Sequence, residues 1–524
     1  MKRRDFIKSM TVAGLATAYP LRSVAGRHSE YFSLHPFVEQ HPDAVFIMRT
    51  QVPDKHDNTA KRQAAAEFGA SVFVPTDAEH GFSASTRVAM KPNLTGYNKN
   101  APRDSKMGIV TDPYFMEGLI ESMKSLGLAG RQFHIREVNG EDLQEDNGYA
   151  DMAKRTGVDH FVKGTKVTRI DPELVVWRDN PDGIYFSKIP YLWPINAADT
   201  FLLNIAKFKA HGMGMTLCAK NLQGSIAASY QQHCNRLDDG MSIDDQHIQP
   251  SAITTIQENY NRHLADNIPR WDKPGRGGGL WQETWATRCL DNNSVTRPEL
   301  HIIEGIYGHD GNFTSGPHDG KPKDFMSNII IFGKNPFHVD VIGHWLGVHE
   351  PGNFGLLHMA IERGQSRFLN PRDIPLYEWF SDGSASLTPL DQFERTLLLT
   401  YYLQRDYGGQ NEPYWHLVDE PFDYTSVKVD GKPPIKPQTF ALAQNYPNPF
   451  NASTTISFTL PRAGNARLEV YDARGRIVDI VADRFFGAGL HQVLWDASGV
   501  PSGTYVCRCL YSGYTRMSKM TVVK

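Results

Sequence analysis

The sequence is poor in cysteine and has none of the spacings by which cysteines usually hold metals. It contains five cysteines in 524 residues, and no Cys-x-x-Cys occurs. This excludes a ferredoxin-type iron–sulfur motif and a structural zinc ribbon, so we expect no iron–sulfur cluster in this chain. Cys507 and Cys509 stand two apart on one predicted strand, where roughly 6.5 to 7 Å separates their α-carbons. We therefore expect no disulfide between them.

A large excess of charge of either sign is also absent. The chain has 55 lysines and arginines against 58 aspartates and glutamates, a formal net charge of -3. This balance argues against a nucleic-acid-binding protein that works through a basic surface. No apolar run is long enough to span a bilayer, so we expect no transmembrane span in the mature chain. No His-Glu-x-x-His or comparable spacing occurs, so the sequence assigns no metal.

The N-terminus has the pattern of an export signal. Arg3 and Arg4 precede a weakly apolar stretch, residues 10–21, that is too short for a membrane-spanning helix. The segment resembles a twin-arginine signal, which implies the twin-arginine translocase as a partner. Small residues before Gly26 predict cleavage after position 25, so we assign residues 1–25 to a signal peptide. The alternative is a basic N-terminus followed by an ordinary helix.

Residues 26–428 alternate short apolar runs with helical patterns. The expected strands and buried segments are 88–90, 200–205, 300–303 and 329–332, and residues 114–126 form an amphipathic helix pattern. This order predicts an α/β domain with a mostly parallel sheet. Thr388 and Pro389 stand ahead of an apolar run and predict a last helix that closes the domain. The prolines in residues 429–439 predict a semi-rigid linker.

Residues 440–524 show the period-two alternation of strands with one buried face, interrupted by glycines. This pattern predicts a small Ig-like β-sandwich. Residues 445–451 read Asn-Tyr-Pro-Asn-Pro-Phe-Asn, and with the Trp495-Asp496 pair and the strand ending at Lys524 they resemble the type A sorting domain of the type IX secretion system. The resemblance implies the type IX machinery as a partner and export through the periplasm to the cell surface or medium. The alternative is a structural β-module without a sorting role.

The segment richest in candidate chemistry lies in the middle of the chain. Lys207, Lys209, His211 and Lys220 follow an apolar strand into a glycine-bearing loop. Such a loop presents cations and backbone N–H groups to an anion, so we hypothesise a small carboxylate or phosphate ligand. The alternative is a solvated rim of lysines beside a structural histidine.

The central region resembles the domain of unknown function 362 (DUF362) family. The residues that carry the resemblance are Lys91, Pro92 and Asn93; Thr111, Asp112 and Pro113; Lys207, Lys209, His211, Thr216, Lys220, Asn221 and Gly224; Glu304 to Asn312; and Asn335 to Asp340 with Gly347 beyond. Two departures stand out. No cysteines are present for the iron–sulfur module that some members carry, and Phe313-Thr314 stands where the family usually has Gly-Pro.

Most of these matching polar residues stand where predicted strands end. If the strands are neighbours in one sheet, the residues converge, because ligands of open α/β folds bind outside the carboxyl ends of the strands. We therefore expect one cavity lined by Lys91, Asn93, Lys209, His211, Lys220, Asn221, Asp310 and Asp340, with Lys207 as a further ligand-binding candidate. Asp310, Asp340 and His211 are the catalytic candidates. The two aspartates suit a divalent cation, the orientation of a lysine or general-base catalysis, and these alternatives stay open.

The sequence thus supports three interpretations of function. The leading one is an exported α/β protein that binds or converts a small anionic ligand, with the reaction unknown. The second is a surface protein that captures such a ligand without converting it. The third is a redox accessory protein whose iron–sulfur partner is a separate chain. An acid with a raised pKa beside the lysines would favour catalysis.

Overall fold

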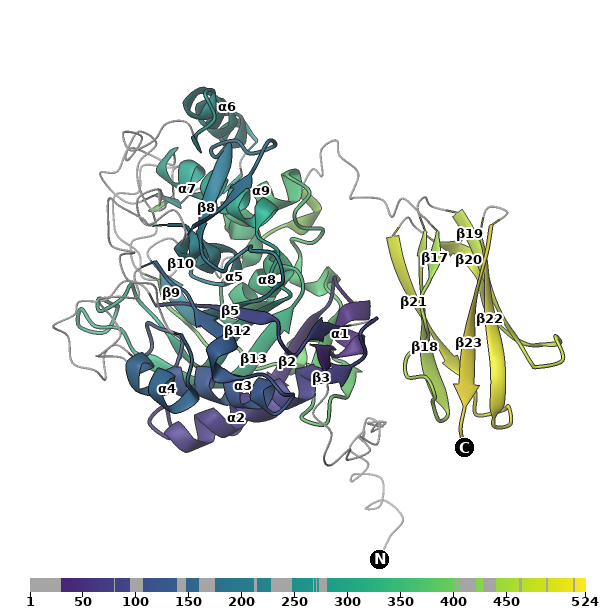
Figure 1. The fold of residues 1–524 in the computed structure, drawn as a ribbon. Coiled ribbons are helices and arrows are strands. Elements are labelled where there is room, and N and C mark those ends of the chain that lie inside the picture. Colours follow the sequence, from purple (N-terminus) through teal and green to yellow (C-terminus); the bar gives the residue numbers. More distant parts are fainter. Residues whose placement is uncertain are drawn as a thin grey trace, which may run out of the picture. The chain divides into compact units, whose positions relative to one another are not determined.

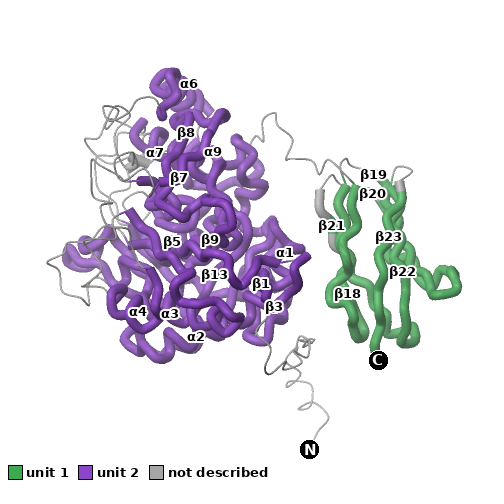
Figure 2. Tube along the Cα trace, viewed as in Figure 1, with its two compact units in different colours: residues 1–20, 429–524 green, residues 21–428 purple. Residues whose placement is uncertain are grey.

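The protein is described here by a computed structural model. It describes residues 30–79, 81–94, 107–138, 148–159, 175–211, 214–227, 247–266, 268–269, 271–272, 280–400, 404–405, 421–426, 440–460, 464–486, 489–511 and 514–524. The expected signal peptide (1–25) and linker (429–439) lie outside these residues. The chain divides between residues 428 and 429 into two compact units, coloured separately in Figure 2. No helix in the described ranges is long and apolar enough to cross a membrane.

The larger unit is built on a nine-stranded sheet with helices on both faces (Figure 1). Its strands are β2 (Val45–Arg49), β5 (Arg87–Pro92), β6 (Phe133–Ile135), β9 (Thr200–His211), β10 (Gly214–Met215), β12 (Leu300–His309), β13 (Asp324–Gly333), β14 (Leu376–Trp379) and β15 (Ala385–Leu387). The order across the sheet is β15-β14-β2-β13-β12-β9-β5-β6, and β10 pairs with β9. From the pairings, β2, β5, β6, β9, β12 and β14 run in one direction and β10, β13 and β15 in the other. The predicted α/β class with a mostly parallel sheet is confirmed.

The remaining elements of this unit are short strands, helices and 3-10 turns. The small sheets consist of β1 (Tyr31–Leu34), β3 (Phe73–Thr76) and β4 (Phe82–Ser83); β7 (Val175–Asp179) and β8 (Lys188–Leu192); and β11 (Trp271–Asp272) and β16 (Gln404–Arg405). The helices are α1 (Pro36–Gln40), α2 (Asn58–Val72), α3 (Pro113–Lys124), α4 (Tyr149–Thr156), α5 (Cys218–Asn221), α6 (Ala252–Ala265), α7 (Leu280–Val295), α8 (Pro336–Leu346) and α9 (Gly355–Glu362). The 3-10 turns are η2 (Gly130–Gln132), η5 (Leu222–Ser225), η8 (Pro351–Asn353), η9 (Pro371–Asp373), η10 (Leu390–Gln392) and η11 (Tyr424–Ser426).

Alternate residues of the central strands face two different helix layers. On β13, Ile331 belongs to the core shared with α5, α7 and α8, whereas Phe332 packs edge-on against Phe68 of α2, with ring centroids 5.0 Å apart. Strands buried on both faces read as continuous apolar runs, which explains the sequence of residues 329–332. The helices α2 and α3 therefore cover one face of the sheet, and α5 and α8 cover the other.

The helix predicted after Thr388 does not form. Only the turn η10 is helical there, and residues 393–400 have no regular secondary structure. Their backbone groups bond to other parts of the unit: Thr396 N–H donates to Leu346 O, and Leu399 O accepts from Gly311 N–H. Leu398 is buried in the core beside Gly308. Tertiary hydrogen bonds and the burial of one leucine have outweighed a local N-cap pattern.

The helix expected at 114–126 is present as α3, which begins with Asp112 as N-cap and Pro113 in the first turn. Its packing against α2 depends on Gly118. A Cβ at this position would lie 2.1 Å from the backbone oxygen of Arg62 on α2, which is closer than van der Waals contact allows. The two helices can approach this closely only because position 118 has no side chain.

Gly118→Val is therefore expected to destabilise the larger unit. Separating α2 from α3 should lower the free energy of unfolding by about 1 to 3 kcal/mol, measured by urea titration. Glu121→Ala, on the exposed side of the same helix, is the control and should change it by less than about 0.5 kcal/mol. A wild-type urea midpoint for Gly118→Val would contradict this account of the helix pair.

The smaller unit contains two antiparallel sheets around a core of its own. One sheet has the order β17-β18-β21 and the other β20-β19-β22-β23. Their bounds are β17 (Ala441–Leu442), β18 (Ser453–Leu460), β19 (Gly464–Tyr471), β20 (Ile477–Phe486), β21 (Gly489–Asp496), β22 (Gly503–Tyr511) and β23 (Tyr514–Val522). Phe450 and Trp495 meet in the core with ring centroids 5.6 Å apart. The arrangement agrees with the predicted small β-sandwich. The structure describes Cys507 and Cys509 as free, buried thiols.

The Asn-Pro-Phe-Asn opening is hydrogen-bonded to the last strand. Asn448 Oδ1 accepts from Thr521 N–H at 2.7 Å, and Phe450 N–H donates to Thr521 O at 3.0 Å. Val523 N–H in turn donates to Phe450 O. The motif and the terminal strand of the sequence pattern therefore form one structural feature.

Candidate functional site

The carboxyl ends of the neighbouring strands β5, β9 and β12 carry a concentration of buried polar side chains. Lys91 ends β5, Lys207 and Lys209 lie on β9, and Glu304 lies on β12 opposite Lys207. All four side chains are almost completely buried. Burial of a charge without a partner is costly, so the partner of each group decides what it does.

Lys207 belongs to a closed network on the side of α2 and α3. Its Nζ donates to both oxygens of Glu304, at 2.9 and 2.7 Å, and lies 3.4 Å from the centre of the Tyr307 ring. Lys61 of α2 pairs with Asp112 at 2.6 Å, and Tyr307 donates to the same carboxylate at 3.0 Å. Asp112 N–H donates to Glu304, which joins the two ion pairs. The network balances two cations with two carboxylates.

Burial disfavours the charged forms of this network. It raises the pKa of Glu304 to about 7 even though Lys207 opposes the rise, and it lowers the pKa of Lys207. Glu304 is thus an acid with a raised pKa among the lysines. Oε2 accepts two hydrogen bonds and Oε1 accepts one, all from groups of the protein, so Glu304 is engaged in this network.

Lys91 belongs to a second network, on the side of α5. Its Nζ donates to Glu137 Oε2 at 2.7 Å, to Asn221 Oδ1 at 3.2 Å and to its neighbour's carbonyl, Pro92 O, at 2.7 Å. Asn221 also donates to Lys91 O and to Asn204 Oδ1. The structure therefore brings Lys91 and Asn221 together, while Lys207 is bound to the opposite helix layer.

Gly224 makes room for the acid of this second network. A Cβ at position 224 would lie 2.1 Å from Glu137 Oε1, and Val138 N–H donates to Gly224 O at 2.9 Å. The backbone of η5 thus runs directly against the carboxylate that neutralises Lys91. This explains on steric grounds why a glycine follows Lys220 and Asn221 at this spacing.

Lys209 differs from the other lysines because it has no acid of its own. Its side chain is 1% exposed, and its Nζ has no hydrogen-bond partner in the described structure. The nearest compensation is the ring of Phe313, whose centre lies 5.2 Å from Nζ. Burial, together with the positive charge of Lys220, holds the pKa of Lys209 well below its ordinary value. The described structure therefore places no carboxylate in hydrogen-bond contact with the Lys209 ammonium group.

Thr216 and Lys220 stand beside Lys209. Thr216 N–H donates to Lys209 O at 3.2 Å in the β9–β10 hairpin, and residues opposite each other in an antiparallel pair point to the same face. The Thr216 hydroxyl is buried and unpartnered. Lys220 is 8% exposed, and its charge acts on both Lys209 and Lys91. Asn93 adds an unpartnered buried oxygen after β5.

His211 and Phe313 close the end of β9. The His211 side chain is buried and meets the Phe313 ring edge-on, with centroids 5.2 Å apart. Phe313 has a φ of 55°, in the left-handed region that non-glycine residues seldom occupy. Its carbonyl accepts from His309 Nε2 at 2.9 Å, and Nδ1 of that histidine bonds to Asp324 at 2.7 Å. Phe313 therefore lies against Lys209 and His211.

Asp310 and Asp340 are engaged in holding the backbone. Asp310 accepts from Lys323 N–H at 2.7 Å and from His318 Nε2 at 2.6 Å, which fixes the connection between β12 and β13. Asp340 accepts from the N–H groups of Cys218 and Ala219 at 2.7 and 2.9 Å, which fixes the start of α5. Burial raises the pKa of both aspartates, that of Asp340 to about 7. Their catalytic roles stay predictions, and each of their oxygens is already hydrogen-bonded.

The comparison with protein families agrees with this geometry. The family model described as "Domain of unknown function (DUF362)" matches residues 88–344, and the model described as "Secretion system C-terminal sorting domain" matches residues 444–524. The chain carries a DUF362 domain followed by a sorting domain. The sorting domain directs export through type IX secretion to the cell surface or the extracellular space.

Two other comparisons add little to this assignment. No curated protein matches the sequence. A solved structure, the Ig1 domain of mouse SynCAM 2, is 9% identical over 15% of this chain and 95% of its own, with a TM-score of 0.12. A likeness at this level carries no argument about the function of the chain.

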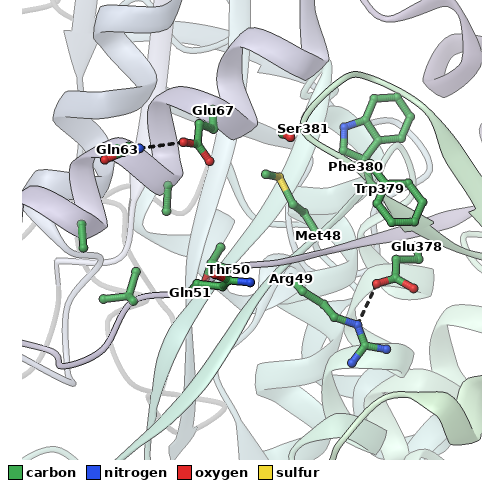
Figure 3. Close-up of a pocket in the computed structure, with 13 residues that line it drawn as sticks. Met48, Arg49, Thr50, Gln51, Gln63, Glu67, Glu378, Trp379, Phe380 and Ser381 are labelled. Atoms are coloured by element: carbon green, nitrogen blue, oxygen red, sulfur yellow. Dashed lines mark hydrogen bonds and ion pairs between the residues drawn. The ribbon is translucent and has the colours of Figure 1, made fainter. Parts of the chain in front are cut away.

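The larger unit also has a pocket of about 410 Å³ at the carboxyl ends of β2 and β14, formed by residues outside the range that the DUF362 model matches (Figure 3). The charged groups that line it are paired: Arg49 with Glu378 at 2.8 Å, and Glu67 with Gln63 at 2.9 Å. Two strands, β13 and β12, separate it from β9. The only cation among its described lining residues, Arg49, is paired with Glu378, and Glu67 bonds to an uncharged amide, so we regard the constellation around Lys209 as the better candidate site.

Sequence reasoning found the lysines of the DUF362 domain but missed Glu137, Gln223 and Tyr307. Glu137 stands two residues after the short strand β6, and a polar residue after a strand of the parallel sheet was the signal that could have pointed to it. Gln223 and Tyr307 have no comparable signal. No group of three His, Cys, Asp or Glu side chains among the described residues is arranged to hold a metal ion.

Removing one member of the Lys207–Glu304 pair should be more damaging than removing both. Lys207→Met leaves a carboxylate buried without its cation and should lower the free energy of unfolding by about 3 to 5 kcal/mol. The double variant Lys207→Met/Glu304→Leu should recover most of that loss, measured by urea unfolding in a double-mutant cycle. Additive losses would show that the two residues are not coupled.

Proposed function

We propose that this exported protein binds a small anionic ligand in its DUF362 domain, with Lys209, Thr216 and Lys220 as the anion-binding groups. The observation that carries the proposal is the Lys209 ammonium group, which is buried and has no hydrogen-bond partner among the described residues. An anion placed between the two lysines would supply the missing charge and accept from the Thr216 hydroxyl, which is likewise unpartnered.

The balance of charge around the site supports an anion. Three nearby lysines have acids at 2.6 to 2.7 Å: Lys61 with Asp112, Lys91 with Glu137 and Lys207 with Glu304. Lys209 and Lys220 have no ion-pair partner in the parts of the chain described. The site therefore has two cations in excess. In a partly dry environment, such an excess attracts a small anion far more strongly than the same charges would in water.

Binding is better supported than conversion. The acids with raised pKa values, Glu304 and Asp340, have their oxygens occupied by Lys207 and by backbone N–H groups. A general base needs an oxygen within hydrogen-bond reach of the proton that it removes. The proposed site holds an anion with positioned donors, and the acid oxygen without a partner beside it, Glu137 Oε1, belongs to a carboxylate whose other oxygen is paired with Lys91.

The comparison of Lys209→Met with Lys207→Met tests the proposal. Lys209→Met removes a buried cation without a partner, so the free energy of unfolding should rise, whereas Lys207→Met should lower it. Lys209→Met should also abolish the binding of sulfate or malonate measured by titration calorimetry. The two lysines lie two residues apart on one strand, which makes them matched controls. A loss of stability in Lys209→Met with unchanged anion binding would overturn the proposal.

Lys220→Ala should weaken anion binding without much change in stability. Loss of one charge-assisted hydrogen bond costs roughly 1.5 to 3 kcal/mol, which corresponds to a Kd about 10 to 150 times higher. Lys220 has no acid partner whose charge would be left buried, so the melting temperature should stay close to that of the wild type. Equal losses of affinity and stability would favour a structural role for Lys220.

Anion affinity should fall as the pH rises. In the free protein the pKa of Lys209 lies well below its ordinary value, and a bound anion should raise that pKa. At a pH between the free-state and the bound-state pKa, the complex therefore holds more protons than the free protein. Affinity is therefore highest below the free-state pKa and falls by up to tenfold per pH unit above it. The charged groups that act on Lys209 are Lys220, Glu137 and Lys207, and the Phe313 ring lies beside it.

Sulfate is a suitable probe because it stays ionised over the whole working range of pH. Titration calorimetry in two buffers with different ionisation enthalpies should detect proton uptake on binding. Lys209→Met serves as the control and should show no such uptake. Proton release, or an affinity that rises with pH, would contradict this role for Lys209.

A further inference from the structure

Beside the anion-binding groups lie two more buried atoms without partners, one an acceptor and one a donor. Glu137 Oε2 is bonded to Lys91, but its Oε1 has no hydrogen-bond partner in the structure as described. Gln223 Nε2 is also unpartnered. Both side chains are at least nine-tenths buried. A buried donor and a buried acceptor without partners are atoms of the kind that hydrogen-bond to a ligand.

The hydrogen bond from Trp285 shows which atom of the Gln223 amide is without a partner. Trp285 Nε1 can only donate, and it donates to the side-chain oxygen of Gln223 at 3.0 Å. The amide orientation is therefore fixed, and the nitrogen is the atom left over. The Glu137 carboxylate approaches Gly224, the next residue along the chain, and its charge acts on Lys209. The Glu137 carboxylate thus lies against the backbone of η5, the turn that carries Gln223, and its charge reaches Lys209.

We infer that the anionic ligand carries a hydroxyl group, which donates to Glu137 Oε1 and accepts from Gln223 Nε2. A hydroxyl group both donates and accepts, as this pair of atoms requires. An ammonium group donates but cannot accept from Gln223, and it would be repelled by the two lysines in excess. A carbonyl group accepts but leaves Glu137 Oε1 unsatisfied. The ligand class is thus a small hydroxylated carboxylate or phosphate ester.

This inference rests on the proposed function, because the hydroxyl group is brought in by the anion bound at Lys209 and Lys220. Experiment can separate the inference from the proposed function. The anionic group of a compound decides whether the compound binds, and its hydroxyl group decides how much more tightly it binds than its deoxy analogue. Matched pairs of compounds therefore measure the contribution of Glu137 and Gln223 alone.

The test measures the Kd of two matched pairs on the purified full-length protein by titration calorimetry. The carboxylate pair is lactate and propionate, and the phosphate pair is glycerol 3-phosphate and propyl phosphate. The hydroxylated member of at least one pair should bind about tenfold more tightly than its deoxy partner, and the pair that shows the difference identifies the anion. Equal affinities within both pairs would overturn the inference while leaving anion binding intact.

Two variants locate the effect. Gln223→Met should remove most of the preference for the hydroxylated compound and leave the Kd of the deoxy compound nearly unchanged. Glu137→Gln, which places a donor where the acceptor stood, should also remove the preference; because it takes the acid from Lys91 and a negative charge from near Lys209, only the ratio of the two Kd values is compared in this variant. Gln63→Met, in the pocket of Figure 3, is the control and should keep the preference.

Each remaining outcome is decisive. A preference that survives in both variants would show that other residues read the hydroxyl group and would overturn the assignment of Glu137 and Gln223. If no compound of either pair binds to the wild-type protein, and sulfate does not bind either, the proposed function itself fails and the inference fails with it.

Discussion

The fold of the larger unit depends on neutralising ammonium groups that are buried at the ends of its parallel strands. A charged lysine in the interior is costly unless an acid meets it, because the desolvation of an isolated charge costs several kcal/mol. Lys91 and Lys207 satisfy this condition with Glu137 and Glu304. The acids belong to β12 and to the segment after β6, so these pairings also join the strands β5, β9 and β12 to their neighbours.

The same carboxylates and their neighbours set the positions of the helices. Asp112 is at once the N-cap of α3, the partner of Lys61 on α2 and an acceptor for Tyr307. Asp340 on α8 holds the first N–H groups of α5, the helix on which Lys220 lies. The anion-binding groups are therefore placed by rigid elements on both sides of the sheet. Such preorganisation reduces the cost of ordering side chains when a ligand binds.

The features that could be predicted from the sequence are those that depend on residues close together in the chain. Apolar runs such as residues 329–332 gave the strands, and Asp112 with Pro113 gave the start of α3. The sorting domain was recognisable because its motif lies within seven residues. The helix expected after Thr388 failed because Leu398 gains more from the core than from a helix. The pairing of Lys91 with Glu137 could not be predicted, since an acid 46 residues away gives no local signal.

The difference between Lys207 and Lys209 was invisible in the sequence for the same reason. Both stand on β9 with the same side-chain direction expected from strand alternation, and the family pattern treats them alike. They differ because Glu304 lies in register with Lys207, whereas the pairing of β9 with β12 shifts before it reaches Lys209. An irregularity in one strand pair thus leaves one of two equivalent lysines without an acid.

Phe313 shows how the chain covers that lysine in the absence of a ligand. A non-glycine residue in the left-handed region costs of order 1 kcal/mol or more, so other contacts must hold it there. His309 bonds to the carbonyl of Phe313 with Nε2 and to Asp324 with Nδ1, which anchors the Phe313 backbone. Lys55 completes the chain by pairing with Asp324 at 2.9 Å. The ring of Phe313 thereby gives Lys209 weak compensation, which a bound anion, with full charge and direct hydrogen bonds, would exceed.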